Sequence, residues 1–154
     1  RHIRNMSITN ACRDLIREID ESKEIAKLMQ RIEALGIEKI AEAIRLFYSE
    51  DLAPEHQPML DETVVFAEIS QIKNKKKAHR LTQRVVIYLV CRERGEFTGK
   101  LIGKRGSRIR ALNDEMATLL ESNHNILSVV LMDDVVRERQ HLEKDFSKFL
   151  ISLN

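Results

Sequence analysis

The sequence predicts an α+β fold in which helices come first and strands flank a glycine-rich turn. Residues 7–52 place apolar side chains at helical spacing. Residues 64–72 and 85–91 are rich in valine and isoleucine, which is typical of strands. The turn follows the second of these runs and holds two glycines three residues apart, Gly103 and Gly106.

The helical region begins after Ser7 or Thr9, because either residue is a good N-cap. The acidic stretch 20–22 either interrupts this helix or continues it. Gly36 is expected to end the next helical segment as a C-cap. A further helix is predicted from Ile37 to about residue 52, so we expect two or three helices in this region.

Two prolines in residues 53–58 are predicted to exclude a regular element there. The strands predicted at 64–72 and 85–91 are expected to pair as a hairpin, with the lysine-rich residues 73–80 in the loop. The second strand is apolar on both faces, which indicates a central or covered position. The triple lysine in the loop is also compatible with a nuclear-localisation patch.

The net charge of +2 conceals a strong asymmetry along the chain. Residues 73–110 contain 13 Lys and Arg but only two acids, a net charge of +11, whereas the remaining residues carry −9. Positive charge concentrated around the glycine turn is expected of a nucleic-acid site. The apolar fraction of 43% is ordinary for a globular chain of 154 residues.

The turn itself has the features of a phosphate-binding corner. Glycines at 103 and 106 permit positive φ and allow another backbone to approach closely. Ser107 is predicted to cap the following helix, and Ile109 and Leu112 are expected to face its core. A helix N-terminus behind such a turn presents free N–H groups and a positive dipole end.

Residues 102–109, Ile-Gly-Lys-Arg-Gly-Ser-Arg-Ile, resemble the I-G-x-x-G-x-x-I core of KH domains, which bind single-stranded nucleic acid. In that family the G-x-x-G loop joins two short helices and holds the backbone of about four nucleotides. The apolar run 85–91 upstream and Gly99 in the first helix strengthen the resemblance. It implies RNA-binding residues at Gly99, Lys100, Leu101, Ile102, Gly103, Lys104, Arg105, Gly106, Ser107, Arg108, Ile109 and Arg110.

The resemblance also implies distinct roles within this set. Lys104 and Arg105, with their flanking glycines, would hold the sugar–phosphate backbone. Leu101, Ile102 and Ile109 would form the apolar floor, and for the two isoleucines a core position is favoured. No aromatic residue lies in the turn, so the edge of a nearby strand would read the bases.

Two element orders remain open beyond the turn. In the first, residues 118–122 and 126–132 are strands and 135–153 is a closing helix, which is the type I order of KH domains. In the second, the helix after the turn continues to Glu121 and one strand follows, which is the type II order. Spacing favours the first. We expect a helical extension at 1–58 and a KH domain of three or four strands at 59–154.

The predicted function is therefore a single-stranded RNA-binding module of a regulatory or RNA-processing protein, with single-stranded DNA open as a ligand. The alternative is a protein-interaction or dimerisation scaffold, with a partner or a second copy on the N-terminal helices. The sequence contains no catalytic motif. Cys12 and Cys91 are far apart and suggest neither a disulfide nor a metal site, and the five scattered histidines do not suggest a metal site either. We expect no enzyme activity, no cofactor and no membrane segment. We also expect the chain to be a fragment of a longer protein and to be located in the cytoplasm or the nucleus.

Overall fold

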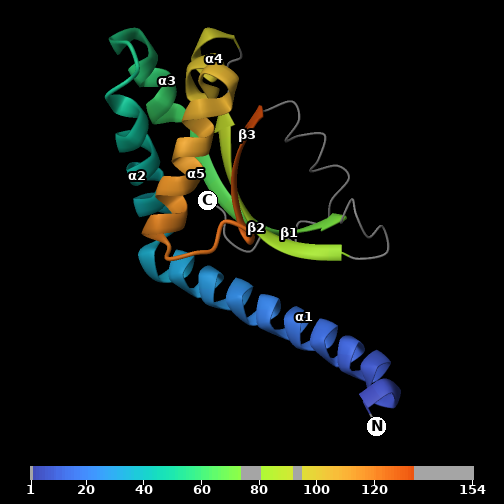
Figure 1. Ribbon diagram of the computed structural model, residues 1–154. Helices are drawn as coiled ribbons and strands as arrows, with labels where there is room; N and C mark the ends of the chain where they lie inside the picture. The colour runs from blue at the N-terminus through green and yellow to red at the C-terminus, as the bar shows by residue number, and fades with distance from the viewer. Residues whose placement is uncertain (1, 74–80, 92–94, 134–154) are drawn as a thin grey trace.

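The computed structural model describes residues 2–73, 81–91 and 95–133, with side chains described for 9–71, 83–91 and 95–132. Helices pack on one face of a three-stranded sheet, and one long helix projects beyond them (Figure 1). The elements in chain order are α1 (His2–Leu35), α2 (Ile37–Ser49), η1 (Pro54–His56), α3 (Gln57–Glu62), β1 (Val64–Lys73), β2 (Leu81–Cys91), α4 (Glu96–Ile102), η2 (Lys104–Gly106), α5 (Ser107–Leu119) and β3 (Leu127–Asp133).

The N-terminal region contains two helices separated by one glycine. α1 passes through the acidic stretch 20–22 without interruption. Gly36, at φ 91°, ends the helix, as predicted, and its N–H donates to the Ile32 carbonyl at 2.9 Å. α2 then buries Ile40, Ile44 and other residues at helical spacing.

The segment with two prolines is not irregular, contrary to the prediction. It forms the short helices η1 and α3, and each proline lies at the first or second position of its helix. A proline is tolerated there because the N–H groups of the first turn have no partner within the helix.

The hairpin prediction is confirmed by the pairing of β1 with β2. The two strands are antiparallel, with Phe66 opposite Tyr88 and Val64 opposite Val90. β3 pairs with the other edge of β2 in parallel, with Val85 opposite Leu127. β2 is therefore the central strand, which explains why it is apolar on both faces.

Alternation along the strands separates two apolar layers. The layer toward the helices contains Ala67, Ile87 and Val129 together with buried residues from α1, α2, α4 and α5. The opposite layer contains Phe66, Val86, Tyr88, Val90 and Met132. In this second layer the Phe66 and Tyr88 rings stack at 5.0 Å, and the Tyr88 hydroxyl donates to Glu68 at 2.9 Å.

The favoured order beyond the glycine turn is wrong, because residues 118–122 are not a strand. α5 continues to Leu119 and buries Met116 and Ala117 against the core. This packing favours a helix over a strand at the start of the segment. A turn at 124–126 leads into β3, and the described elements follow the second predicted order. The predicted closing helix at 135–153 lies outside the described residues.

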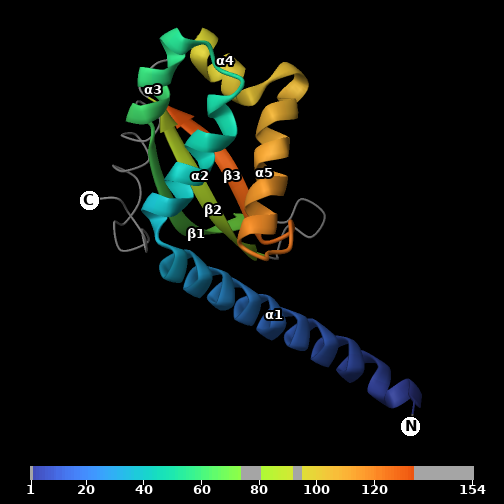
Figure 2. The same ribbon diagram turned by 90° about the vertical axis from the view of Figure 1, so that its left-hand side faces the viewer.

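Residues on both sides of the predicted boundary at 58/59 contribute to the first apolar layer. Ile32 and Tyr48 belong to it, as do Leu89 and Leu112. The division of the chain into an extension at 1–58 and a second domain stays a prediction. α2 packs directly against the sheet (Figure 2). Among the described helices, none is both long and apolar enough to cross a membrane.

Candidate nucleic-acid interface

The glycine turn lies at an exposed corner between α4 and α5. α4 ends at Gly103, whose N–H donates to the Gly99 carbonyl at 2.9 Å. Gly106 then closes a single tight turn by donating to the Gly103 carbonyl at 3.0 Å. Lys104 and Arg105 lie between them with exposed side chains. The two helices therefore meet at a corner from which both cations project.

Backbone geometry requires glycine at position 103. Its φ of 77° and ψ of 169° lie in a region that is essentially restricted to glycine. A Cβ there would approach the Arg108 backbone nitrogen at 2.7 Å. Arg105, at φ 55°, also adopts the left-handed conformation. The corner is thus held in one unusual backbone conformation.

The N-terminus of α5 has no side-chain cap, which corrects the role predicted for Ser107. Gly106 occupies the N-cap position, and Ser107 is the first helical residue. A glycine cannot supply a capping oxygen, so no side-chain oxygen at that position accepts from the first N–H groups of the 13-residue helix. The Ser107 N–H donates to the Lys104 carbonyl, and this end of α5 carries the positive end of the helix dipole.

The five predicted cations have three different environments. Lys100, Lys104 and Arg105 have exposed side chains. Arg110, also exposed, donates to the Arg105 carbonyl at 2.6 Å and so braces the corner from within. Arg108 has a structural role of its own.

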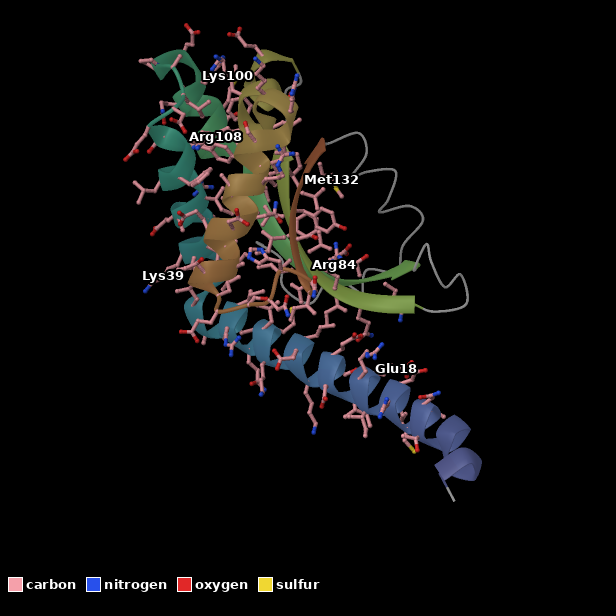
Figure 3. The ribbon with its side chains drawn as sticks, in the orientation of Figure 1. Glu18, Lys39, Arg84, Lys100, Arg108 and Met132 are labelled. Atoms are coloured by element: carbon pink, nitrogen blue, oxygen red, sulfur yellow. The ribbon has the colours of Figure 1, made fainter. Side chains whose placement is uncertain are left out.

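Arg108 joins α5 to the C-terminal end of α2 (Figure 3). Its guanidinium forms an ion pair with Asp51, and its Cζ lies 4.3 Å from the centre of the Phe47 ring. A third contact is a hydrogen bond to the Phe47 carbonyl at 3.4 Å. These contacts use the planar face and the Nη2 donor of the guanidinium. Arg108 therefore links α5 to the end of α2, and its guanidinium is already engaged by Asp51 and Phe47.

The three apolar residues predicted as the floor have different environments. Leu101 is fully buried and belongs to the core. Ile102 is 41% exposed, so the core position favoured for it is wrong. Ile109 is half-buried and packs against the core, as favoured. Ile102 is therefore the apolar side chain that the corner offers to a ligand.

Sequence reasoning missed Tyr48, which anchors the end of α4. Its buried hydroxyl donates to the Leu101 carbonyl at 2.7 Å. Burial raises the pKa of Tyr48 well above its usual value. A signal was present, because Tyr48 follows Ile40 and Ile44 at core spacing, and a tyrosine in a core needs a polar partner.

The edge of β3 lies beside α5 in both ribbon views (Figures 1 and 2). Asn113 of α5 donates to the Val129 carbonyl at 3.1 Å and accepts from the Val129 N–H at 2.8 Å. Because strand groups alternate in direction, Leu131 turns its N–H and carbonyl toward the same edge. α5 and β3 run in opposite directions (Figure 2), so the C-terminal half of β3, which includes Leu131, lies toward the N-terminal end of α5.

Charge and exposure together define a surface that could bind an anionic chain. It consists of the exposed cations at the corner, the uncapped start of α5 and Ile102. Within the described part of the chain, no group of His, Cys, Asp and Glu is suited to hold a metal ion. The lysine-rich residues 74–80 lie outside the described residues.

Comparison of the chain with models of protein families, with curated proteins and with solved structures finds no match in any of the three.

Proposed function

We propose that the chain is a non-catalytic module that binds single-stranded RNA through the corner formed by residues 103–106. The observation that carries the proposal is the exposure of Lys104 and Arg105 between two glycines, directly before an uncapped helix. Main-chain donors and flexible cations at one point suit a phosphate backbone. The corner is braced by the hydrogen bonds of Tyr48 to the Leu101 carbonyl and of Arg110 to the Arg105 carbonyl.

The order of elements supports a KH-type module of type II. α2 and β1 precede β2, and β2 is followed by α4, the glycine turn, α5 and a parallel β3. In this proposal the phosphates lie over the corner and the N-terminus of α5. The bases extend toward the β3 edge, where the Leu131 peptide groups supply one donor and one acceptor.

The affinity of a single module is expected to depend strongly on salt. Each phosphate neutralised contributes about −0.7 to the slope of log K against log salt for single strands. Binding is also expected to be modest. Among the described residues of the corner, the exposed cations that do not bond to the backbone of the turn are three, Lys100, Lys104 and Arg105.

The test compares two charge-reversed variants of equal net charge. Lys104→Asp/Arg105→Asp removes the cations of the corner, and aspartate tolerates the left-handed conformation at position 105. Lys27→Glu/Lys39→Glu makes the same charge change at exposed helical positions away from the corner. Labelled poly(U), poly(A) and poly(dT) are titrated by fluorescence anisotropy at low and moderate salt.

We expect the parent and the Lys27/Lys39 variant to bind RNA, and the Lys104/Arg105 variant to lose at least ten-fold in affinity. The circular dichroism of all three should be alike. Equal binding by the two variants would exclude the corner as the site. No binding by the parent to any of the three polymers would reject the proposed function and favour a scaffold that binds protein.

A further inference from the structure

A groove with a largely apolar lining runs between α2 and α5, the two helices that lie side by side over the sheet (Figure 2). Its lining includes the half-buried Phe47 and the buried Met116. Leu46 on the α2 wall and Leu119 on the α5 wall are 70% and 44% exposed. Large exposed apolar side chains on both walls of one groove are typical of a surface that binds another protein.

The charges at this groove are mainly negative. Its lining has three carboxylates and one cation, namely Glu50, Asp51, Glu115 and Arg108. Arg108 is paired with Asp51 and lies against the Phe47 ring, so its charge is already engaged (Figure 3). Among the described residues, no cation forms an ion pair with the exposed Glu50 or Glu115. Each wall of the groove therefore has one uncompensated negative charge.

The sign of these charges and the helical walls select the class of ligand. Carboxylates repel a phosphate chain, so the groove and the cationic corner suit ligands of opposite charge. An extended peptide would need main-chain donors and acceptors along the groove, but the backbone groups of α2 and α5 bond within each helix. A helix satisfies its own backbone groups and packs its side chains between those of other helices. The groove therefore suits a helix whose apolar stripe is flanked by cations.

We propose that the groove between α2 and α5 binds an amphipathic helix of a partner protein that has lysine or arginine on both sides of its apolar stripe. The stripe covers Leu46 and Leu119, and the flanking cations lie beside Glu50 and Glu115. Burial of apolar side chains supplies most of the affinity, and the charges set the specificity. This inference does not require RNA binding. Its tests contain no RNA, so its failure is distinct from failure of the corner.

The first test uses three labelled peptides of about 20 residues, a length at which a helix can form. The first peptide has leucine at helical spacing with lysine on both sides of the stripe, and the second has glutamate in place of lysine. The third has the composition of the first in scrambled order. Fluorescence anisotropy measures their binding to the full chain at low and moderate salt.

We expect the parent to bind the lysine peptide about ten-fold more tightly than either of the other two, because it alone combines the stripe with the complementary charge. No binding of the lysine peptide would overturn the proposal. Equal binding of the lysine peptide and either of the others would also overturn it.

A pair of variants tests the apolar walls. Leu46→Gln/Leu119→Gln removes the exposed leucines and keeps good helix formers, so affinity for the lysine peptide should fall about ten-fold. Leu15→Gln/Ile19→Gln makes a similar change at exposed positions of α1 and should leave that affinity unchanged. The circular dichroism of both variants should match the parent, because all four side chains are exposed. Equal loss of affinity in the two variants would reject the groove as the site.

A second pair tests the charges of the walls. Glu50→Lys/Glu115→Lys should reverse the preference, so that the glutamate peptide binds about ten-fold more tightly than the lysine peptide. Glu33→Lys/Glu62→Lys makes the same change in net charge at exposed positions outside the groove and should keep the preference of the parent. If the two variants behave alike, the peptides respond to the total charge of the chain, and the proposal fails.

The last measurement asks whether a second copy of the chain occupies the groove instead. Sedimentation equilibrium without peptide should give the monomer mass of 17.9 kDa, which leaves the groove free for a partner. A dimer that is lost in Leu46→Gln/Leu119→Gln would identify the groove as an interface between two copies and overturn the proposed partner.

Discussion

Asn113 and Val129 are joined by two hydrogen bonds of opposite direction. The Asn113 amide nitrogen donates to the Val129 carbonyl at 3.1 Å, and the Val129 N–H donates to the Asn113 Oδ1 at 2.8 Å. A side-chain amide has the donor and acceptor of a peptide group, so it replaces a neighbouring strand at this point. The contact closes part of the exposed edge of β3 and fixes α5 beside it.

Replacing Asn113 should lower stability through loss of this pair. Asn113→Ala removes both bonds, and we expect the free energy of unfolding to fall by about 1–3 kcal/mol. Asn113→Asp should not restore it, because a carboxylate cannot donate to the Val129 and Ile109 carbonyls. Urea unfolding measures both variants, with the exposed Asn125→Ala as control. Parent-like midpoints would show that the edge contact contributes nothing.

Two glycines four residues apart should respond oppositely to alanine. Gly103→Ala places a Cβ 2.6 Å from Arg108 Cγ at a positive φ, and should destabilise by about 1–3 kcal/mol. Gly99 lies inside α4 with nothing within 4 Å of the added Cβ. Gly99→Ala should therefore stabilise by up to about 1 kcal/mol. Thermal melting tests the pair, and equal shifts would contradict the assigned geometry.

Ile102 and Ile109 provide a second matched pair. Ile109→Asn puts an amide against the core, so the free energy of unfolding should fall by about 1–3 kcal/mol and the melting midpoint should fall with it. Ile102→Asn changes a side chain that is 41% exposed, so its midpoint should stay near that of the parent while RNA affinity falls. A cooperative melt of the Ile109 variant with an unchanged midpoint would show that Ile109 is not a core residue.

The two tyrosines of the chain should titrate only when the protein unfolds. Burial raises the pKa of Tyr48 and Tyr88 above the ordinary 10.0, and the bond to Glu68 adds to this at Tyr88. Because both pKa values are higher in the folded state, the stability they contribute is complete below pH 10 and is lost as the pH rises further. Ultraviolet absorbance of tyrosinate should therefore rise together with loss of circular dichroism. An earlier rise, with a midpoint near that of exposed tyrosine and an intact spectrum, would contradict their burial.

Local pattern was sufficient for most elements of the fold. Apolar spacing predicted the helices of residues 7–52, and the break at Gly36 followed from its freedom at positive φ. Runs of β-branched residues predicted β1 and β2, and a strand apolar on both faces indicated a central one. Each of these signals depends on neighbours within a few positions, which is why the sequence alone reveals it.

Local sequence pattern could not predict the structure of the segment at the end of α5. Residues 118–122 suit a strand or the end of a helix, and only the burial of Met116 and Ala117 against the core decides for a helix. For the same reason, the proline-containing segment 54–62 could be read as irregular, although the prolines fit first helical turns.

The sequence by itself determined that the chain has helices, a hairpin and a cationic turn between Gly103 and Gly106. Only the tertiary structure decided that β3 is parallel to β2, that Arg108 is bound to Asp51 and that Asn113 closes the edge at Val129. The physical reason is the sequence separation over which each interaction acts. Backbone torsion and side-chain periodicity are local, whereas a side chain meets its partner only after distant segments have packed together.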